Sequence, residues 1–173
     1  MKRIVMFLIV LFVSACSLNG ISPVSEIFKI NAKNIENVDS IMTKYVTSGC
    51  TNSSAKGSLS ITGNEPKTDN VVSVSFLNLK NLSGSNTLKK YSSSSCEPWG
   101  ALFINSTLYN FPSGTVLDLS NGNFSVAKTV VESYDGDELE VTLKGKIQIP
   151  LSKVEDKTIQ VQFEKVEIQN KSH

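Results

Sequence analysis

The stretch Leu117-Asp118-Leu119-Ser120-Asn121-Gly122-Asn123-Phe124-Ser125-Val126 (residues 117–126) decides the fold, because a turn signal lies between two alternating segments. Asn-Gly is the preferred pair for a two-residue type I′ hairpin turn, since both residues tolerate positive φ. A turn centred on it pairs three residues on each side: Leu119 with Phe124, Leu117 with Val126, and Asp118 with Ser125. One face is then apolar, so the segment predicts an antiparallel hairpin with a defined register.

Two further reversals extend this hairpin into a four-strand meander. A turn at Asp135-Gly136 predicts three pairs: Val130 with Val141, Val126 with Gly145, and Phe124 with Ile147. A reversal centred near Val154 predicts three more: Ile149 with Ile159, Ile147 with Val161, and Gly145 with Phe163. The apolar phase then shifts between Phe163 and Val166, which indicates a bulge at Glu164 or Lys165.

The first half of the chain also reads mainly as strands. A strand is expected at 26–32, and period-two patterns appear at Leu59 to Ile61 and Val72 to Phe76, with a turn over 63–66 between them. The run from Ala101 to Ile104, with Tyr109 and Phe111, is more typical of a buried strand than of a ligand groove.

One segment reads differently. Apolar residues recur at helical spacing, with Asn34 and Gly49 in position to cap the two ends; they are Ile35, Val38, Met42, Tyr45 and Val46. We therefore expect a mostly β, β-rich α+β fold: an antiparallel sandwich or partly open barrel of seven to nine strands, with a C-terminal four-strand meander and one N-terminal helix.

The amino terminus carries a targeting signal. Lys2 and Arg3 precede an apolar run from Ile4 to Val13 and the small residues Ser14 and Ala15. Ten apolar residues form a helix of about 15 Å, half of the roughly 30 Å hydrocarbon core, so a permanent membrane span is not expected. The tetrapeptide Val13-Ser14-Ala15-Cys16 resembles the lipobox of bacterial lipoproteins. An ordinary signal peptide with a chance cysteine is the alternative.

The lipoprotein resemblance implies a location as well as a modification. It implies cleavage before Cys16, a diacylglycerol on its sulfur and usually an acyl chain on its amino group, which together exceed what stable anchoring needs. The residue that follows the lipidated cysteine, Ser17, resembles the residue at that position in lipoproteins sorted to the outer membrane. The expected organisation is a signal peptide over 1–15, a lipidated Cys16 with a short tether over 16–25, and one periplasm-facing domain over 26–173. A nine-residue tether reaches only about 30 Å, and display on the cell surface is an alternative orientation.

With Cys16 acylated, Cys50 and Cys96 remain. In an exported chain they are most simply interpreted as one disulfide, which would stabilise the fold by roughly 4 kcal/mol in the chain-entropy model. A metal or redox site is the alternative. It lacks support from the sequence, because there is no Cys-x-x-Cys and the only histidine is His173.

The net charge and the missing catalytic motifs limit the classes of function that the sequence supports. Removal of Lys2 and Arg3 leaves 15 basic and 16 acidic side chains, so the sequence argues against nucleic acid or anionic lipid as the primary partner. No nucleophile elbow, zinc-protease motif or phosphate loop is present, and no histidine is placed to act as a base. We expect no cofactor, no metal and no enzymatic activity, although a pair of carboxylates that hydrolyses a glycan is an alternative.

Two local features offer candidate sites. Asp135, Asp137 and Glu138 surround a glycine and invite a calcium interpretation, but a calcium loop needs about six oxygens, so a solvated turn is preferred. Trp99 is either packed beside the disulfide, which is the favoured interpretation, or exposed as an anchor for a partner.

These expectations lead to three functional hypotheses. The leading one is a non-enzymatic protein-binding or scaffold lipoprotein of the envelope. The second is a carrier or pilot protein whose β-barrel holds a lipid or other apolar ligand. The third is a surface-exposed adhesin or host-factor binder.

Overall fold

The computed structural model describes residues 28–30, 36–43, 54–65, 69–93, 95–148, 151, 157–158 and 161–171, with the backbone alone for 28–30, 36–43 and 157–158. These residues form one 12-stranded antiparallel sheet that is nearly closed into a barrel. The mostly β fold class and the partly open barrel are thus confirmed. The count of strands exceeds the seven to nine expected, because several are only two to four residues long.

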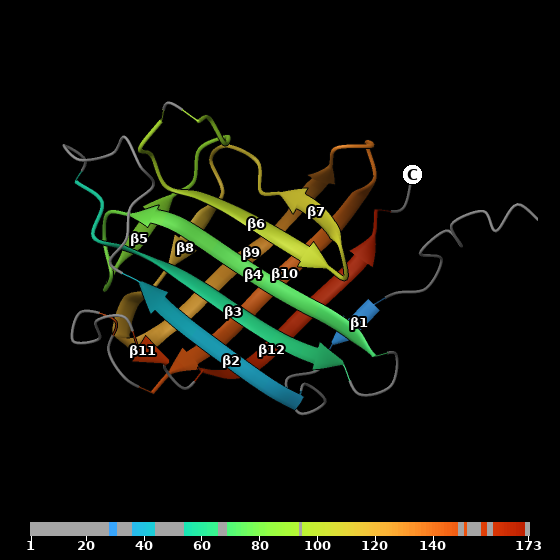
Figure 1. The fold of residues 1–173 in the computed structure, drawn as a ribbon, viewed down its shortest axis with the longest axis horizontal. Helices are drawn as coiled ribbons and strands as arrows, with labels where there is room; N and C mark the ends of the chain where they lie inside the picture. Colours follow the sequence, from blue (N-terminus) through green and yellow to red (C-terminus); the bar gives the residue numbers. More distant parts are fainter. Residues whose placement is uncertain are drawn as a thin grey trace, which may run out of the picture.

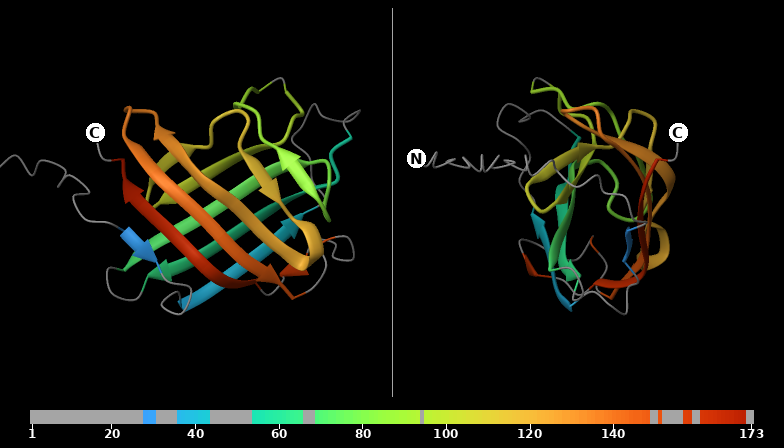
Figure 2. Two further views of the ribbon diagram at one scale, coloured as in Figure 1. Left: turned by 180° about the vertical axis from the view of Figure 1, so that it is seen from behind. Right: turned by 90° about the vertical axis from the view of Figure 1, so that its right-hand side faces the viewer.

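Two layers of the sheet face each other across the core (Figures 1 and 2). The first layer contains β2 (Glu36–Thr43), β3 (Gly57–Glu65), β4 (Asn70–Leu79), β6 (Trp99–Ile104) and β7 (Thr107–Asn110). The second contains β9 (Asn123–Ser133), β10 (Glu138–Ile147) and β12 (Val161–Asn170), with the short strands β1 (Phe28–Ile30), β5 (Ser85–Thr87) and β8 (Val116–Asp118). In Figure 1 the strands of the two layers cross, and β11 (Lys157–Thr158) pairs with β2 at one end of the sheet.

The inward-facing side chains of both layers fill the described part of the core. Leu59, Ile61 and Phe76 come from β3 and β4, and Phe124 and Leu143 come from β9 and β10; each is at most 1% exposed. Burial alternates along these strands, as expected for a sheet with one face toward the core. The described part of the interior is therefore packed with side chains.

The hairpin predicted over residues 117–126 is confirmed. Leu117 pairs with Val126 and Asp118 with Ser125. Asn121 and Gly122 have φ values of 56° and 73°, which is the positive φ at both central residues that a type I′ turn requires. The meander is confirmed too, since β8 pairs with β9, β9 with β10, and β10 with β12.

The predicted register of the second hairpin is wrong by one residue. Val130 pairs with Glu140 rather than with Val141. The connection is a three-residue loop over 134–136, closed by a bond from the Gly136 N–H to the Ser133 carbonyl, and Gly136 has a φ of 88°. A type I turn followed by a left-handed glycine adds one residue to a two-residue turn and moves the register accordingly.

A bulge in β9 shifts the register further. Val141 pairs with Thr129, whereas Leu143 pairs with Val126, so β9 has one extra residue at Ala127 and Lys128. As a result Gly145 lies opposite Phe124, and the predicted pairing of Gly145 with Val126 is wrong. No residue pattern indicated this bulge, because Val130 and Val131 are adjacent and either one fits the apolar face.

The last strand follows its prediction. Ile147 pairs with Val161 and Gly145 with Phe163, and the register shifts between Gly145 and Lys144, which leaves Glu164 as the bulged residue. Phe163 packs edge-on against Phe124 at a centroid distance of 5.7 Å. The aromatic rings fill the space beside Gly145, where a Cβ would lie only 2.7 Å from the Gln162 carbonyl oxygen. The predicted pair of Ile149 and Ile159 lies outside the described residues.

In the first half, the strand expected within 26–32 is confirmed by β1, and β3 and β4 pair as Leu59 with Phe76 and Ile61 with Val74. The turn between β3 and β4 begins later than expected, because β3 continues to Glu65. The strand over Ala101–Ile104 is confirmed within β6.

The predicted helix is wrong where the structure describes it. Residues 36–43 form β2, which pairs with β3 through Ser40 and Ile61 on one edge and with β11 on the other. Helical propensity is a weak preference, and Asn37, Asp39 and Thr43 are poor helix formers. Pairing with the neighbouring strand satisfies the same backbone groups and overrides the spacing of the apolar residues.

Within the described residues, no helix is long and apolar enough to cross a membrane. The signal peptide, Cys16, the tether and Cys50 lie outside the described residues.

Candidate functional site

The barrel wall is incomplete along one edge of β9. β7 and β8 both pair with this edge, β7 through Tyr109 and Asn110 and β8 through Leu117 and Asp118. The chain joins β7 to β8 directly through residues 111–115, which leave the sheet and arch outward. We call residues 111–115 the arch. Among the described strands, none pairs with 127–131 of β9 on this edge.

The arch is held away from β9 by contacts on its other side. The Phe111 N–H donates to the Gly100 carbonyl, the Gly114 N–H donates to the Leu88 carbonyl, and the Leu88 N–H donates to the Thr115 carbonyl. Phe111 is 2% exposed, and its ring lies 5.6 Å from that of Phe76. Because these backbone groups are already paired with β6 and the segment after β5, the arch cannot also complete the ladder with β9.

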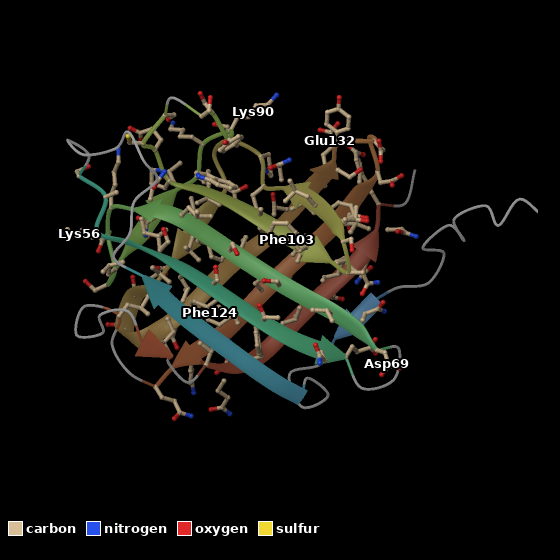
Figure 3. All side chains as sticks on the ribbon, in the orientation of Figure 1. Lys56, Asp69, Lys90, Phe103, Phe124 and Glu132 are labelled. Atoms are coloured by element: carbon tan, nitrogen blue, oxygen red, sulfur yellow. The ribbon has the colours of Figure 1, made fainter. Side chains whose placement is uncertain are left out.

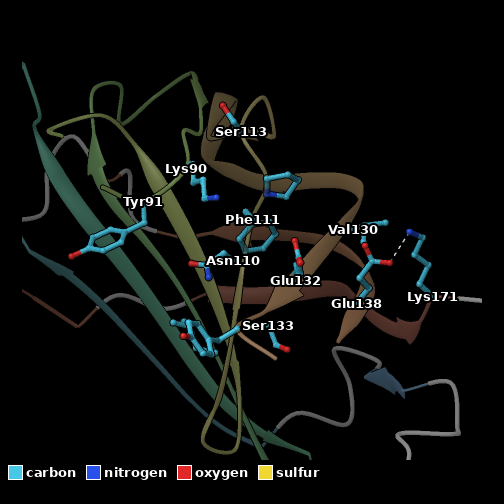
Figure 4. A pocket seen from close by; sticks show the side chains of 13 residues that line it. Lys90, Tyr91, Asn110, Phe111, Ser113, Val130, Glu132, Ser133, Glu138 and Lys171 are labelled. Carbon is cyan, nitrogen blue, oxygen red and sulfur yellow. Dashed lines mark hydrogen bonds and ion pairs between the residues drawn. The ribbon is translucent and has the colours of Figure 1, made fainter. Parts of the chain in front are cut away.

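A groove of about 730 Å³ opens beside the arch, at the edge of the barrel between the loop after β5 and the β9–β10 hairpin (Figure 4). We call it the rim groove. It is lined by Lys90, Tyr91, Leu108, Asn110, Phe111, Pro112, Ser113, Val130, Glu132, Ser133, Tyr134, Glu138 and Lys171. Its volume falls within the range of small-molecule and peptide pockets.

Exposed apolar side chains gather at this edge. Among the described residues, five large apolar or aromatic side chains are strongly exposed: Val71, Tyr91, Leu108, Val116 and Tyr134. Three of them line the rim groove, and Tyr134 at the hairpin tip is 99% exposed. Val116 lines a smaller groove of about 460 Å³, which shares Pro112 and Ser113 with the rim groove and continues between the arch and β9. We call this continuation the slot.

Charged groups in the rim groove are unevenly paired. Lys171 Nζ and Glu138 Oε2 form an ion pair at 2.6 Å. Glu132 lies directly opposite Glu138, and no partner is described for its carboxylate. The Ser133 N–H donates to the Asp137 carbonyl, so the alternation of an antiparallel ladder makes Glu132 and Glu138 a non-hydrogen-bonded pair with Cα atoms about 4.5 Å apart. Two acidic residues thus face each other across the ladder, and Lys171 pairs with Glu138 only.

Figure 3 shows Lys90 and Glu132 along the same edge of the barrel, with Phe124 in the wall away from that edge. In Figure 4, Lys90 and Glu132 extend from opposite sides of the rim groove. Lys90 is exposed, and no ion pair is described for it. The groove therefore offers aromatic surface, one unpaired anion and one unpaired cation, a composition suited to binding a peptide or protein segment.

Trp99 supports the groove without lining it. It is half-buried at the start of β6, and its ring lies 4.7 Å from the ring of Tyr91, which does line the groove. Cys96 is disulfide-bonded. Cys50, its expected partner, lies outside the described residues, so the pairing of Cys50 with Cys96 and a partner contact at Trp99 both stay predictions.

The acidic residues considered for calcium belong to the hairpin at the edge of the groove. Asp135 lies in the three-residue loop, Asp137 pairs with Ser133 through the backbone, and Glu138 pairs with Lys171. In the described part of the chain, no three His, Cys, Asp or Glu residues are grouped so that they could hold a metal ion.

Perturbed acids lie away from the rim groove. Hydrogen bonds from the Ser120 hydroxyl and N–H lower the pKa of Asp118, which terminates β8 before the Asn-Gly turn. Hydrogen bonds from Lys144 and Lys146 lower the pKa of Glu164 in the β12 bulge. Burial, and then the charge of Asp137, raise the pKa of Tyr109, which points into the core beneath the groove. These shifts follow from structural contacts.

Sequence reasoning missed the groove residues. Leu108 and Tyr109 are adjacent on one strand, so only one can face the core; this was a usable signal that the other is exposed. Tyr134 at the start of the second turn was a further signal, because turns favour Gly, Asn, Asp, Ser and Pro. The unpaired state of Glu132 depends on the actual register of β9 and could not be read from the sequence.

Comparison with known proteins adds no relative: no protein-family model, no curated protein and no solved structure matches the chain. The rim groove must therefore be interpreted from its own chemistry.

Proposed function

We propose that this protein is a bacterial envelope lipoprotein, anchored through Cys16 to the outer membrane and facing the periplasm, and that its rim groove binds a protein partner without catalysing a reaction. One observation carries the binding part of the proposal. Three of the five strongly exposed large apolar side chains in the described part of the chain line this single groove. Exposed apolar clusters with a polar border are typical of protein interaction sites.

The composition of the groove supports a protein partner. Tyrosine contributes a large, rigid contact surface at low entropic cost, and Tyr91 and Tyr134 both line the groove, from the loop after β5 and from the β9–β10 hairpin. Tyr91 is backed by Trp99, so its ring is held in place. Lys90 and Glu132 supply polar contacts that fix the orientation of a partner.

The packing of the described core residues favours the groove over the barrel core as the binding site. Phe76, Phe124 and Leu102 are fully buried, so an apolar ligand that entered this part of the core would have to displace them. A small apolar pocket of about 200 Å³ lies where Tyr109, Leu139 and Ile168 meet near the β6–β7 turn. It is smaller than the roughly 300 Å³ at which ligand pockets usually begin.

Site-specific photocrosslinking in living cells tests the proposal. A photoreactive residue at Leu108, which is 38% exposed in the groove, should give a discrete adduct with a protein partner. The same residue at Val71, which is 41% exposed on β4 and does not line the groove, is the matched control and should give none. Adducts of equal yield from both positions, or from neither, would contradict a partner at the groove.

The anchor is tested separately. Metabolic labelling with an alkyne-bearing fatty acid should mark the wild-type protein, and Cys16→Ser should lose the label and leave the membrane fraction. Protease treatment of intact cells should leave the protein uncut if it faces the periplasm, and digestion would favour the surface orientation. Loss of the Leu108 adduct in Cys16→Ser would show that the partner is met at the membrane.

A further inference from the structure

We propose that the segment bound in the rim groove is an extended peptide of the partner that pairs with the backbone of Val130 and places a basic side chain against Glu132. This inference rests on the proposed protein-binding function and names the chemistry of the partner at that site. Two groups that the fold leaves unpaired support it: the backbone N–H and C=O of Val130, and the Glu132 carboxylate.

The first group is the backbone of Val130. Because the Ser133 N–H donates to the Asp137 carbonyl, Ser133 directs its backbone toward β10, and so does Val131. Alternation along β9 then turns the N–H and C=O of Val130 toward the other edge, where Val130 lines the rim groove. No described strand pairs with Val130 on that edge.

The arch does not satisfy these groups either. Its N–H groups at Phe111 and Gly114 are used by Gly100 and Leu88 on its far side, and the Thr115 N–H donates to the Pro112 carbonyl within the arch. The one described contact across the slot joins the Thr115 and Thr129 hydroxyls at 3.5 Å. A residue in extended conformation from another chain would supply both a hydrogen-bond donor and a hydrogen-bond acceptor to the Val130 backbone, as in β-strand addition.

The second group is the Glu132 carboxylate. Glu132 lies directly across the ladder from Glu138, whose carboxylate is paired with Lys171 at 2.6 Å. Like charges placed opposite each other on a sheet are unfavourable. A lysine or arginine from the partner would neutralise Glu132 and relieve that repulsion, and the rings of Tyr91 and Tyr134 provide apolar surface for its alkyl chain. The charge of the site thus favours a basic peptide over an acidic one.

Selection from a display library of random eight-residue peptides tests the inference on the purified full-length protein. We expect the enriched peptides to share a Lys or Arg and to exclude proline next to it. Repeating the selection on Glu132→Gln should remove the basic preference, and Glu164→Gln, a carboxylate change in the β12 bulge, should keep it. Absence of enrichment, or a basic preference that survives Glu132→Gln, would overturn the inference.

The backbone part has its own readout. A synthetic copy of the most enriched peptide should bind Glu132→Gln about tenfold more weakly than wild type, since a hydrogen bond to a charged group contributes about 1.5 kcal/mol. N-methylation of its central residues should also abolish protection of the Val130 amide in hydrogen exchange.

Peptide binding that leaves this amide unprotected would refute strand pairing while a partner adduct at Leu108 still stood, so the two proposals fail separately.

Discussion

The two halves of β9 show how one strand can be both structural and exposed for binding. Residues 123–126 pair with β10, Ser125 and Val126 pair with β8 as well, and Phe124 is fully buried beside Gly145 and Phe163. Residues 127–131 pair on one edge only, and the slot and rim groove open beside them. The bulge at Ala127 and Lys128 marks the boundary, so the wall is closed where aromatic packing holds it and open where the arch is drawn away.

The largest difference between the halves should appear when a side chain is truncated in each. Phe124→Ala should lower the free energy of unfolding by about 3 to 5 kcal/mol, because it removes a fully buried ring and leaves a cavity. Val130→Ala, at a half-buried position that lines the rim groove, should cost under about 1 kcal/mol. Urea unfolding of both variants measures the contrast, and equal losses would show that the slot half is packed as tightly as the other.

A glycine substitution tests the close packing of the paired half. Gly145→Ala should destabilise the protein by about 1 to 3 kcal/mol, since the added Cβ would collide with the Phe124 ring and lie 2.7 Å from the Gln162 carbonyl oxygen. Thermal unfolding provides the measurement. Phe124→Leu removes the ring that the Cβ meets, so the double variant should lose less stability than the sum of the two single losses, and strict additivity would place the strain in the backbone alone.

Gly136 provides a matched change at the open end of the same hairpin. A Cβ there would meet nothing within 4 Å, but the φ of 88° disfavours any other residue. Gly136→Ala should therefore cost about 1 kcal/mol through backbone conformation and not through packing. Gly136→Asn should cost less than Gly136→Ala, because asparagine tolerates positive φ; the reverse order would indicate a hidden contact at the loop.

The groove half should respond in binding and not in stability. Tyr134 is 99% exposed, so Tyr134→Ala should change the free energy of unfolding by less than about 0.5 kcal/mol. The same change should weaken the Leu108 adduct with the partner several-fold, as expected when an aromatic contact is lost from an interface. An unaltered adduct in a stable variant would remove Tyr134 from the binding surface.

The same contrast explains what the sequence predicted. The Asn121-Gly122 hairpin, the pairing of Gly145 with Phe163 and the bulge at Glu164 were all predictable, because turn residues and apolar alternation agreed there. Where two apolar residues are adjacent, as at Val130 and Val131, alternation gives two equal answers, and the bulge in β9 was missed. The helix expected over 35–46 failed for a related reason: spacing alone cannot weigh a helix against a strand that finds partners on both edges.

The groove was less predictable than the fold. Its exposed aromatic and apolar residues come from the loop after β5, from β7 and from the β9–β10 hairpin, which only the three-dimensional structure brings together. The unpaired backbone of Val130 results from the arch, and the arch results from contacts of Phe111 with β4 and β6 that no local pattern encodes.

The smallest expected effect is a pH dependence of the free energy of unfolding, which arises at Asp118 beside the Asn121-Gly122 turn. Hydrogen bonds from Ser120 lower the pKa of Asp118 below its ordinary value of 3.8, so the unfolded state binds the proton more readily than the folded state. The stabilisation is therefore complete above pH 3.8 and is lost as the pH falls through the lower folded pKa. Asp118→Asn keeps an oxygen acceptor but not the charge, so it should be less stable than wild type at pH 6, and the difference should shrink between pH 4 and pH 2 in urea unfolding. A difference that stays constant over this range would mean that the turn depends on the shape of the side chain and not on its charge.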